Sequence, residues 1–389
     1  MQKLIPCQLA VGIVYCPVYF IPEINKRLFS TLTLEQFPNL WKPKSRNKQM
    51  ERQAYRIDKV GSTSNLKLVT ESLQEPEANE VQVEVHAIGL NFADIFAVHG
   101  LYSATPKGSF VPGLEFSGII TKVGEEVTKY KAGDRVMGVT RFGGYANHLN
   151  IDDRHIVPLG DDWSYEEGAA YLVQGMTAYY ALVSLGGLQK NHTVLIHSGA
   201  GGVGIMANRI AKCYDAYTIG TIGNSKKMSV LETEGFDGKI IRSKQFGADL
   251  EKQLDGRDLN LIVETIGGEI FKAGYNLLAP QGRMVVVGAS QFASPGSRPN
   301  FIKLLWKFLT RPKIDPQQMI QENRSVMGFN LIWLYEKVDV MDDILKEMSE
   351  LDLGKPMVGQ VFEFEEMHQA IKLFQSGKST GKVVVKTKV

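Results

Sequence analysis

After residue 49, apolar and polar residues first alternate with a period of two. The segment VQVEVHAI at residues 81–88 alternates apolar and polar side chains, which is typical of a strand with one buried face. The segment GDRVMGV at residues 133–139 opens on a Gly-Asp pair and predicts a further short strand after a turn. We therefore expect residues 50–171 to form a mainly β domain.

The hydrophobic rhythm changes after Gly175. Apolar runs of strand length alternate with helix-length segments, in the order TVLIHS, IMANRIAKCY, AYTIGTIG, a charged helix from Lys226, LNLIVETIG and GRMVVVGAS. This alternation predicts a doubly wound parallel sheet beyond Gly175, and hence an α/β protein. The late strand GKVVVKTKV needs a sheet to join. We expect residues 333–389 to return to the β domain.

Residues 1–49 differ from the rest in charge. They hold seven basic and two acidic residues, 7 − 2 = +5, so the remaining chain carries 37 − 40 = −3. An apolar stretch at residues 4–21 precedes Lys26 and Arg27, which allows a targeting peptide or a membrane anchor, but prolines interrupt it and no small-residue cleavage site follows. We expect a disordered or targeting extension, upstream of a natural start at Met50.

Overall composition excludes several classes of function. The net charge of the chain is only +2 and its basic residues are scattered, so we expect no nucleic-acid partner. The three cysteines, Cys7, Cys16 and Cys213, cannot form a disulfide framework, and no CxxC or Cys/His cluster has the spacing of a zinc site. We expect a reducing, cytoplasmic location and no metal.

The strongest local motif is HSGAGGVG at residues 197–204, which lies between an apolar strand and a helix-like run. In a GxGxxG turn, the first glycine permits the tight bend, the second lets the backbone approach a pyrophosphate, and the third lets the helix pack closely. The helix N-terminus then offers free N–H groups to the phosphates. The alternative is a plain glycine-rich turn, but the flanking strand and helix favour a dinucleotide. The residues expected to bind it are Gly199, Ala200, Gly201, Gly202, Val203 and Gly204.

The next strand predicts which dinucleotide is bound. It is followed by GNSKK at residues 223–227, where an NAD site would place an acid for the ribose 2′-hydroxyl. Ser225 and Lys226 can instead bind a 2′-phosphate through charge-assisted hydrogen bonds. The alternative is a solvated lysine pair, although cations at a helix start oppose the helix dipole when no anion is present. We predict NADPH as the cofactor.

Several motifs stand in the order found in a known family. They are LNFAD at 90–94, GLY at 100–102, PGLEFSG at 112–118, VGEEVTKYKAGDRV at 123–136 and GAGGVG at 199–204. From about residue 53 to its end, the chain resembles the quinone oxidoreductases related to zeta-crystallin, which are zinc-free medium-chain dehydrogenases/reductases. NRSVMGFNL at 323–331 further resembles the branch named after the vesicle amine transport protein.

The resemblance implies a domain plan. Residues 50–171 would form a GroES-like catalytic domain, and residues 172–332 a Rossmann domain that carries an insertion at 291–324. Residues 333–389 would return to the catalytic domain. Substrate would bind in the cleft between the two domains, at the carboxyl ends of the parallel strands.

The resemblance also indicates the chemistry of the acceptor side. Zinc-dependent relatives have metal ligands near Asn91, at Leu114 and near Val173, and neither Leu nor Val can ligate zinc. Hydrogen-bond donors alone would then polarise the acceptor, which favours quinones and conjugated enones. Asn91 and Tyr102 can each donate to an oxygen that gains negative charge, so we expect them to orient the acceptor. Their alternative roles are a turn Asn before a helix and a surface Tyr.

Further cofactor contacts are expected where strands end. Thr265 follows the strand LNLIVE, and Gly288 and Ala289 follow MVVV, so both segments should open toward the cleft. The family resemblance places Phe329 and Asn330 beside the nicotinamide ribose.

The segment FIKLLWKFL at residues 301–309 predicts an amphipathic helix with a basic side. Its apolar face holds Phe301, Leu304, Leu305 and Phe308, and its basic side Lys303 and Lys307. Such a helix can serve as a lid or dimer contact, or can lie on a membrane surface.

These patterns together predict an NADPH-dependent, zinc-free oxidoreductase that reduces quinones or α,β-unsaturated carbonyls. The rival interpretation is a catalytically idle, nucleotide-binding scaffold in vesicle traffic or lipid handling. The family resemblance favours a homodimer. Residues 301–309 leave open a peripheral contact with a vesicle or with the mitochondrial outer membrane.

Overall fold

The computed structural model describes residues 50–294 and 296–387. The expectations for residues 1–49, a targeting peptide or a disordered extension, lie outside the described residues. Among the helices of the described residues, none is long and apolar enough to cross a membrane.

The first half of the described chain forms antiparallel β-structure, as its alternating pattern predicts. Strands β1 (Met50–Ile57) and β2 (Leu66–Leu73) pair with each other, and a seven-stranded sheet has the order β14-β15-β3-β4-β5-β7, with β6 on β3. Val81, Val83 and Val85 of β3 are fully buried. The strands of the larger sheet are β3 (Glu80–Gly89), β4 (Glu115–Val123), β5 (Arg135–Val139), β6 (His148–Asp152), β7 (Ile156–Pro158), β14 (Val358–Glu363) and β15 (Lys382–Lys386).

The second half forms a parallel six-stranded sheet in the order β10-β9-β8-β11-β12-β13. This is the order of a doubly wound dinucleotide-binding sheet, in which the connection reverses direction between the first and fourth strands, here β8 and β11. Its strands are β8 (Thr193–Ile196), β9 (Tyr217–Ile222), β10 (Gly238–Ile241), β11 (Leu259–Glu264), β12 (Leu278–Val286) and β13 (Ser325–Gly328). The reversal leaves a crevice at the carboxyl ends of β8 and β11, where such sheets bind ligands.

Helices cover both faces of the parallel sheet, which explains why its strands are apolar on both sides. Side chains of α3, α4 and α10 pack on one face, and those of α6 and α7 pack on the other. The charged helix expected from Lys226 begins later, because residues 225–227 form a 3₁₀ turn before α5. The helices are α3 (Leu172–Tyr179), continued by a π-helical turn to Leu185, α4 (Gly202–Cys213), α5 (Met228–Thr233), α6 (Phe246–Leu254), α7 (Gly268–Leu277) and α10 (Val338–Ser349).

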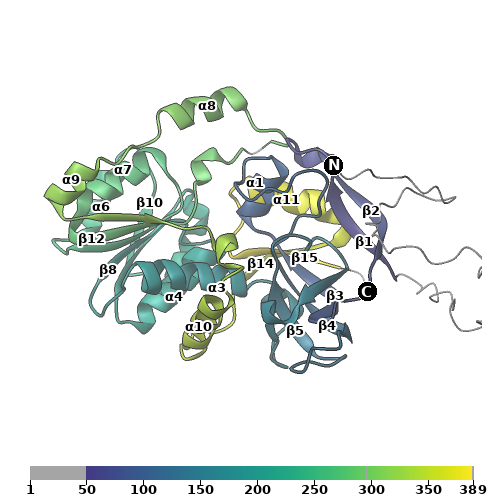
Figure 1. Ribbon diagram of the computed structural model, residues 1–389. Coiled ribbons are helices and arrows are strands. Elements are labelled where there is room, and N and C mark those ends of the chain that lie inside the picture. The colour runs from purple at the N-terminus through teal and green to yellow at the C-terminus, as the bar shows by residue number, and fades with distance from the viewer. Residues whose placement is uncertain (1–49, 295, 388–389) are drawn as a thin grey trace, which may run out of the picture. The chain divides into compact units, whose positions relative to one another are not determined.

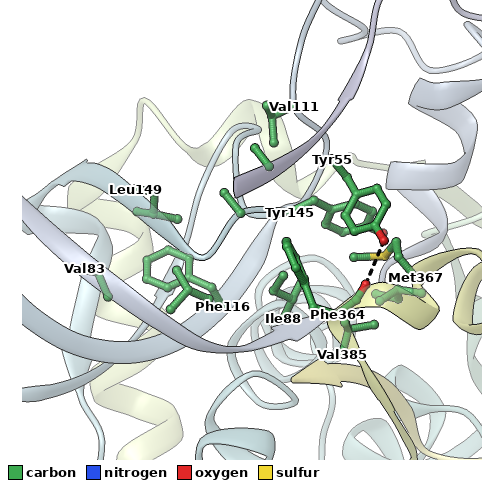
Figure 2. Packing of buried hydrophobic residues seen from close by; sticks show 14 of the residues in the cluster. Tyr55, Val83, Ile88, Val111, Phe116, Tyr145, Leu149, Phe364, Met367 and Val385 are labelled. Carbon is green, nitrogen blue, oxygen red and sulfur yellow. Dashed lines mark hydrogen bonds between the residues drawn. The ribbon is translucent and has the colours of Figure 1, made fainter. Parts of the chain in front are cut away.

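The end of the chain returns to the first sheet. β15 pairs antiparallel with β3 and parallel with β14, and α11 (Met367–Gln375) precedes it. Figure 2 shows the resulting core, in which Phe364, Met367 and Val385 pack among residues of the first half such as Ile88. The Tyr55 hydroxyl donates a hydrogen bond to the Phe364 carbonyl at 2.9 Å. The first domain therefore contains both ends of the described chain.

Two further short helices complete the first domain, and an insertion extends the second. The helices α1 (Phe92–Val98) and α2 (Tyr165–Gly168) belong to the first domain. Between β12 and β13 the chain leaves the sheet to form α8 (Phe301–Leu309) and α9 (Pro316–Glu322). The helix α8 matches the amphipathic segment, and Figure 1 shows it standing apart from both sheets.

Candidate active site

One cavity of about 1280 Å³ lies between the two halves of the described chain. The parallel sheet contributes the carboxyl ends of its strands and the start of α4. The first domain contributes α1, the residues around β4, and the segment 376–382 before and at the start of β15. Because residues from widely separated parts of the sequence meet here, this cavity is the candidate site.

The glycine loop forms the turn that its sequence predicts. Ser198 has a left-handed backbone, with φ of 56°. A Cβ on Gly204 would lie 2.4 Å from the Ser198 carbonyl oxygen, so only glycine lets α4 begin this close to β8. Residues 200–204 line the cavity, whereas Gly199 packs toward Leu231 behind the loop. The free N–H groups of the first turn of α4 therefore face a space that can hold a pyrophosphate.

A buried polar network holds the crevice in shape beneath this loop. His197 Nδ1 lies 2.9 Å from Thr221 Oγ1, and its Nε2 lies 3.2 Å from Glu264 Oε2, with the side chains of His197 and Glu264 fully buried. Glu264 also accepts hydrogen bonds from the N–H groups of Ile266 and Gly267. Burial opposes the charged form, but His197 and these N–H groups outweigh it and lower the pKa of Glu264. The network fixes the turn after β11, where Thr265 lines the cavity.

Two cations lie where the ribose end of a dinucleotide would be placed. Lys227 and Arg242 line the cavity, and neither is within 4.0 Å of a carboxylate among the described residues. Burial lowers the pKa of Lys227, and the nearby charge of Arg242 lowers it further. Arg242 Nη1 donates to Thr221 Oγ1 at 3.0 Å, and burial lowers its pKa too. Two half-buried cations that repel each other form a site for an anion.

The predicted residues Ser225 and Lys226 lie elsewhere. Both are exposed, and neither lines the cavity. Asn224 accepts a hydrogen bond from the Lys226 N–H and starts the 3₁₀ turn, after which Lys227 faces inward. The sequence shows the pair of lysines but did not predict the 3₁₀ turn that separates their directions. Arg242 follows β10 outside any motif, so no sequence signal pointed to it.

The segment 379–382 connects the two sides of the cavity. The Gly381 N–H donates to the Ala200 carbonyl at 2.9 Å, on the glycine loop. Lys227 Nζ donates to the Ser379 carbonyl at 2.5 Å. The next residue, Lys382, points into the first domain and contacts Glu115. The nucleotide loop and the first domain are thus joined through four consecutive residues.

Asn91 caps α1 and is held by a buried cation. Its Oδ1 accepts from Lys382 Nζ at 2.8 Å, and its Nδ2 donates to the Gly89 carbonyl at 3.2 Å. The same ammonium lies 2.5 Å from Glu115 Oε2, with both side chains of the pair almost completely buried. Asp94 closes the cap by accepting from the Asn91 N–H. One N–H of the Asn91 amide is therefore already engaged, and Lys382 determines which way the amide faces.

Tyr102 and Asn330 come from different domains and meet in the cavity. The Tyr102 hydroxyl donates to Asn330 Oδ1 at 2.6 Å. Burial raises the pKa of Tyr102 to about 12, despite the opposing effect of the bond to Asn330. The tyrosine therefore remains a neutral donor throughout the physiological range of pH. Asn330 was expected on the cofactor side and Tyr102 on the acceptor side, so this contact lies at the boundary between the two predicted sets.

The other predicted residues also lie on the cavity wall. Thr265, Gly288, Ala289 and Phe329 line it, and Thr265 Oγ1 lies 3.0 Å from Ser198 Oγ on the glycine loop. The expected set therefore divides simply: Gly199, Ser225 and Lys226 lie off the cavity wall, and the remainder lie on it.

The three positions that would carry zinc in metal-dependent relatives also meet at this cavity. Asn91, Leu114 and Val173 all line it. Glu115 accepts from the Val173 N–H at 3.0 Å, so the first turn of α3 is tied to the same buried acid as Lys382. Across residues 50–294 and 296–387, no three His, Cys, Asp or Glu side chains are grouped to hold a metal.

Comparison with known proteins defines the family. The model for the alcohol dehydrogenase GroES-like domain matches residues 77–188, and that for the zinc-binding dehydrogenase matches residues 202–347. The human synaptic vesicle membrane protein VAT-1 homolog is 31% identical over 313 residues, which are 80% of this chain and 79% of that protein. This chain belongs to the medium-chain dehydrogenase/reductase family. Within these oxidoreductases it stands with the VAT-1 homologues and the quinone oxidoreductases, which confirms the predicted resemblance and fold class.

Two further proteins are similar to this medium-chain dehydrogenase/reductase. The Danio rerio VAT-1 homolog is also 31% identical, over 315 residues, and the match covers 80% of this chain but only 65% of that longer protein. The solved structure of Escherichia coli quinone oxidoreductase complexed with NADPH has a TM-score of 0.75 and 26% identity, covering 87% of this chain and 100% of the other.

The buried pair of Lys382 and Glu115 gives a test of the site's construction. Lys382→Met leaves the Glu115 charge buried without its partner, so it should lower the free energy of unfolding by about 3–5 kcal/mol. Adding Glu115→Gln removes that charge while keeping an acceptor for the Val173 N–H, so the double variant should recover most of the loss. Urea denaturation measures both.

Lys386→Met is the matched control on the same strand. Lys386 pairs with Glu166 at 3.4 Å and is 46% exposed, so its loss should cost only about 0–1 kcal/mol. Equal losses for the single Lys382 variant and the double variant would show that the buried charge is not what holds this junction.

Proposed function

We propose that this protein is an NADPH-dependent reductase of quinones or α,β-unsaturated carbonyls. The observation that carries the proposal is the pairing of two features on one cavity wall. Lys227 and Arg242, which have no carboxylate within 4.0 Å among the described residues, line the cavity as two cations, and Tyr102 lines it as a neutral donor. The two cations suit a 2′-phosphate, and the Tyr102 hydroxyl suits an oxygen that gains negative charge.

The residues present fit NADPH. The turn at Ser198 and the glycine at position 204 bring the N-terminus of α4 to the cavity, where its N–H groups can bind a pyrophosphate. The strand order places the crevice at the reversal between β8 and β11. The NADPH-bound quinone oxidoreductase from Escherichia coli supports the same cofactor for this chain. NADPH supplies a hydride from C4 of its nicotinamide, and one proton from solvent completes the reduction of the acceptor.

The residues around the acceptor polarise it without a metal. Tyr102 can turn its hydroxyl from Asn330 to the acceptor oxygen, and the amide nitrogen of Asn330 stays available for the cofactor. Lys382 holds the Asn91 amide through its oxygen, which leaves the second amide N–H as a donor. Leu114 and Val173 contribute apolar side chains to the wall. Such a wall strengthens these hydrogen bonds by excluding water, and it suits conjugated acceptors that need only modest polarisation.

The rival function is an idle nucleotide-binding scaffold at a membrane. The exposed apolar face of α8 and the names of the VAT-1 relatives favour it. It gives no reason for a half-buried tyrosine to meet Asn330 across the two domains in the cavity that the glycine loop also lines. Homodimer formation, a membrane contact at residues 301–309 and a cytoplasmic location stay predictions.

The cationic site predicts which lysine selects the cofactor. Lys227→Met should weaken NADPH binding about tenfold or more and leave NADH binding unchanged, because one charge-assisted hydrogen bond contributes about 1.5–3 kcal/mol. Lys226→Met is the matched control and should change neither affinity. Fluorescence titration of both nucleotides measures this. A loss of NADPH affinity in Lys226→Met alone would show that Lys226, as expected from the sequence, binds the 2′-phosphate.

Tyr102 is the sharpest test of the chemistry. Tyr102→Phe should lower kcat and kcat/KM together by roughly a hundredfold, because an oxyanion donor contributes about 2.7–4 kcal/mol mainly in the transition state. NADPH affinity should barely change. Tyr130→Phe is the control, since the Tyr130 hydroxyl donates to the Ile156 carbonyl away from the cavity. Steady-state NADPH oxidation over a quinone and enone panel measures both, and a rise in KM alone would show that Tyr102 merely lines the site.

A further inference from the structure

The insertion between β12 and β13 is attached to both domains. It leaves the parallel sheet with the Ser290 N–H bonded to the Thr265 carbonyl. It then crosses to the first domain, where the Ser297 carbonyl accepts from the Thr63 N–H at 2.9 Å and from His99 Nε2 at 3.2 Å. Gln375 of α11 donates to the Ser294 carbonyl nearby.

The insertion then returns to the domain from which it came. Arg324 Nη1, just after α9, donates to the Tyr275 carbonyl at the end of α7 at 3.1 Å. The helix α8 lies between the two attachments, as Figure 1 shows. We call residues 293–294 and 296–315 the strap. Because the strap is anchored on both sides of the cavity, it forms a wall of that cavity rather than a free loop.

The helix of the strap has two apolar faces with different surroundings. The inner face, Phe301, Leu304, Leu305 and Phe308, lines the cavity. The outer face, Ile302, Trp306 and Leu309, does not line it, and its side chains are 63–85% exposed. Lys307 fixes the rotation of the helix by donating to the Gln291 carbonyl.

The wall shared with the first domain is apolar as well. Phe92 and Phe96 of α1 and Phe374 of α11 line the same cavity. The rings of Phe92 and Phe374 lie 4.4 Å apart. Phe301, Leu305 and Phe308 of the inner face line the cavity and are nevertheless more than half exposed. Large apolar surface that remains unfilled inside a cavity indicates an apolar ligand.

We propose that the acceptor carries an extended hydrocarbon chain, which lies between the inner face of α8 and the aromatic side chains of α1 and α11. The proposal rests on the proposed function, since it describes the tail of the molecule whose head Tyr102 would contact. The cavity, at about 1280 Å³, is larger than the roughly 300–1,000 Å³ of a site for one small ligand, so a dinucleotide at its polar end leaves room for a chain. Position also decides the occupant: a membrane or a second copy would cover the outer face, whereas only a ligand inside the cavity reaches the inner one.

The test is the dependence of turnover on chain length. With trans-2-alkenals from four to twelve carbons, kcat/KM should rise about two- to fourfold for each added methylene until the chain fills the space beside the inner face of α8. Leu305→Ser should flatten this series, lowering kcat/KM for the twelve-carbon aldehyde by about tenfold and that for the four-carbon aldehyde by less than twofold. Leu309→Ser is the matched control, because it removes a leucine of similar exposure from the outer face of the same helix, and it should leave the series unchanged.

A binding measurement separates this proposal from the proposed function. The dissociation constants of 2-butanone and 2-dodecanone for the NADP⁺-loaded protein need no turnover. The longer ketone should bind at least a hundredfold more tightly, and Leu305→Ser should reduce that difference by about tenfold. Tight binding of the long ketone with no reduction of any aldehyde would contradict the reductase and keep the chain site. Equal binding of both ketones, or equal effects of the two serine variants, would overturn the chain site even in an active reductase. Loss of vesicle binding or of self-association as the sole effect of Leu305→Ser would assign the helix to a membrane or to a second copy.

Discussion

The site depends on one constraint, which is that the last strand must return to the first sheet across the mouth of the nucleotide loop. Gly381 bonds to Ala200 on that loop, and Lys382 then enters the first domain as the first residue of β15. The ammonium of Lys382 is buried against Glu115 and orients Asn91. Glu115 in turn binds the backbone that leads into the parallel sheet at Val173. Four residues near the C-terminus thereby set the spacing between the cofactor side and the acceptor side.

The electrostatics of the cavity follow from the same arrangement. Charge that is neutralised locally lies at the junction of the domains, in the pair of Lys382 and Glu115. Lys227 and Arg242 also line the cavity, and among the described residues no carboxylate lies within 4.0 Å of either, although the charge of Glu264 partly offsets the lowering of the Arg242 pKa by burial. The space between them is lined by the glycine loop, by neutral donors and by apolar side chains. A cavity arranged in this way can hold an anionic cofactor end to end while keeping the acceptor in a region of low polarity.

The sequence predicted the features that follow from local pattern. The alternation at residues 81–88 and the strand-helix rhythm after Gly175 correspond to β3 and to the six-stranded sheet, because hydrophobic period directly reflects which faces are buried. The amphipathic period at residues 301–309 likewise corresponds to α8. The glycine loop was predictable because its turn, its close packing and its helix are encoded within eight residues.

Features that arise from tertiary contacts were not predictable. Lys382 and Glu115 are 267 positions apart, so neither shows from sequence that it has a partner. Lys227 rather than Lys226 lines the cavity because residues 225–227 form a 3₁₀ turn, which changes the direction in which each side chain points. Arg242 reaches the cavity only because β10 lies beside β9. Tyr102 and Asn330 were each chosen, but nothing local indicated that they would bond to each other.

The proposed function requires that this cavity brings C4 of NADPH to the β-carbon of a conjugated acceptor. Reduction of an α,β-unsaturated ketone with NADPH deuterated at C4, in ordinary water, tests it directly when the product is examined by mass spectrometry and NMR. We expect one deuterium at the β-carbon of the product, from one of the two C4 positions only, and hydrogen from solvent at the α-carbon. A reduced product without deuterium would show that hydride does not pass directly from the cofactor, and no reduced product with any acceptor would show that the cavity binds nucleotide without performing chemistry.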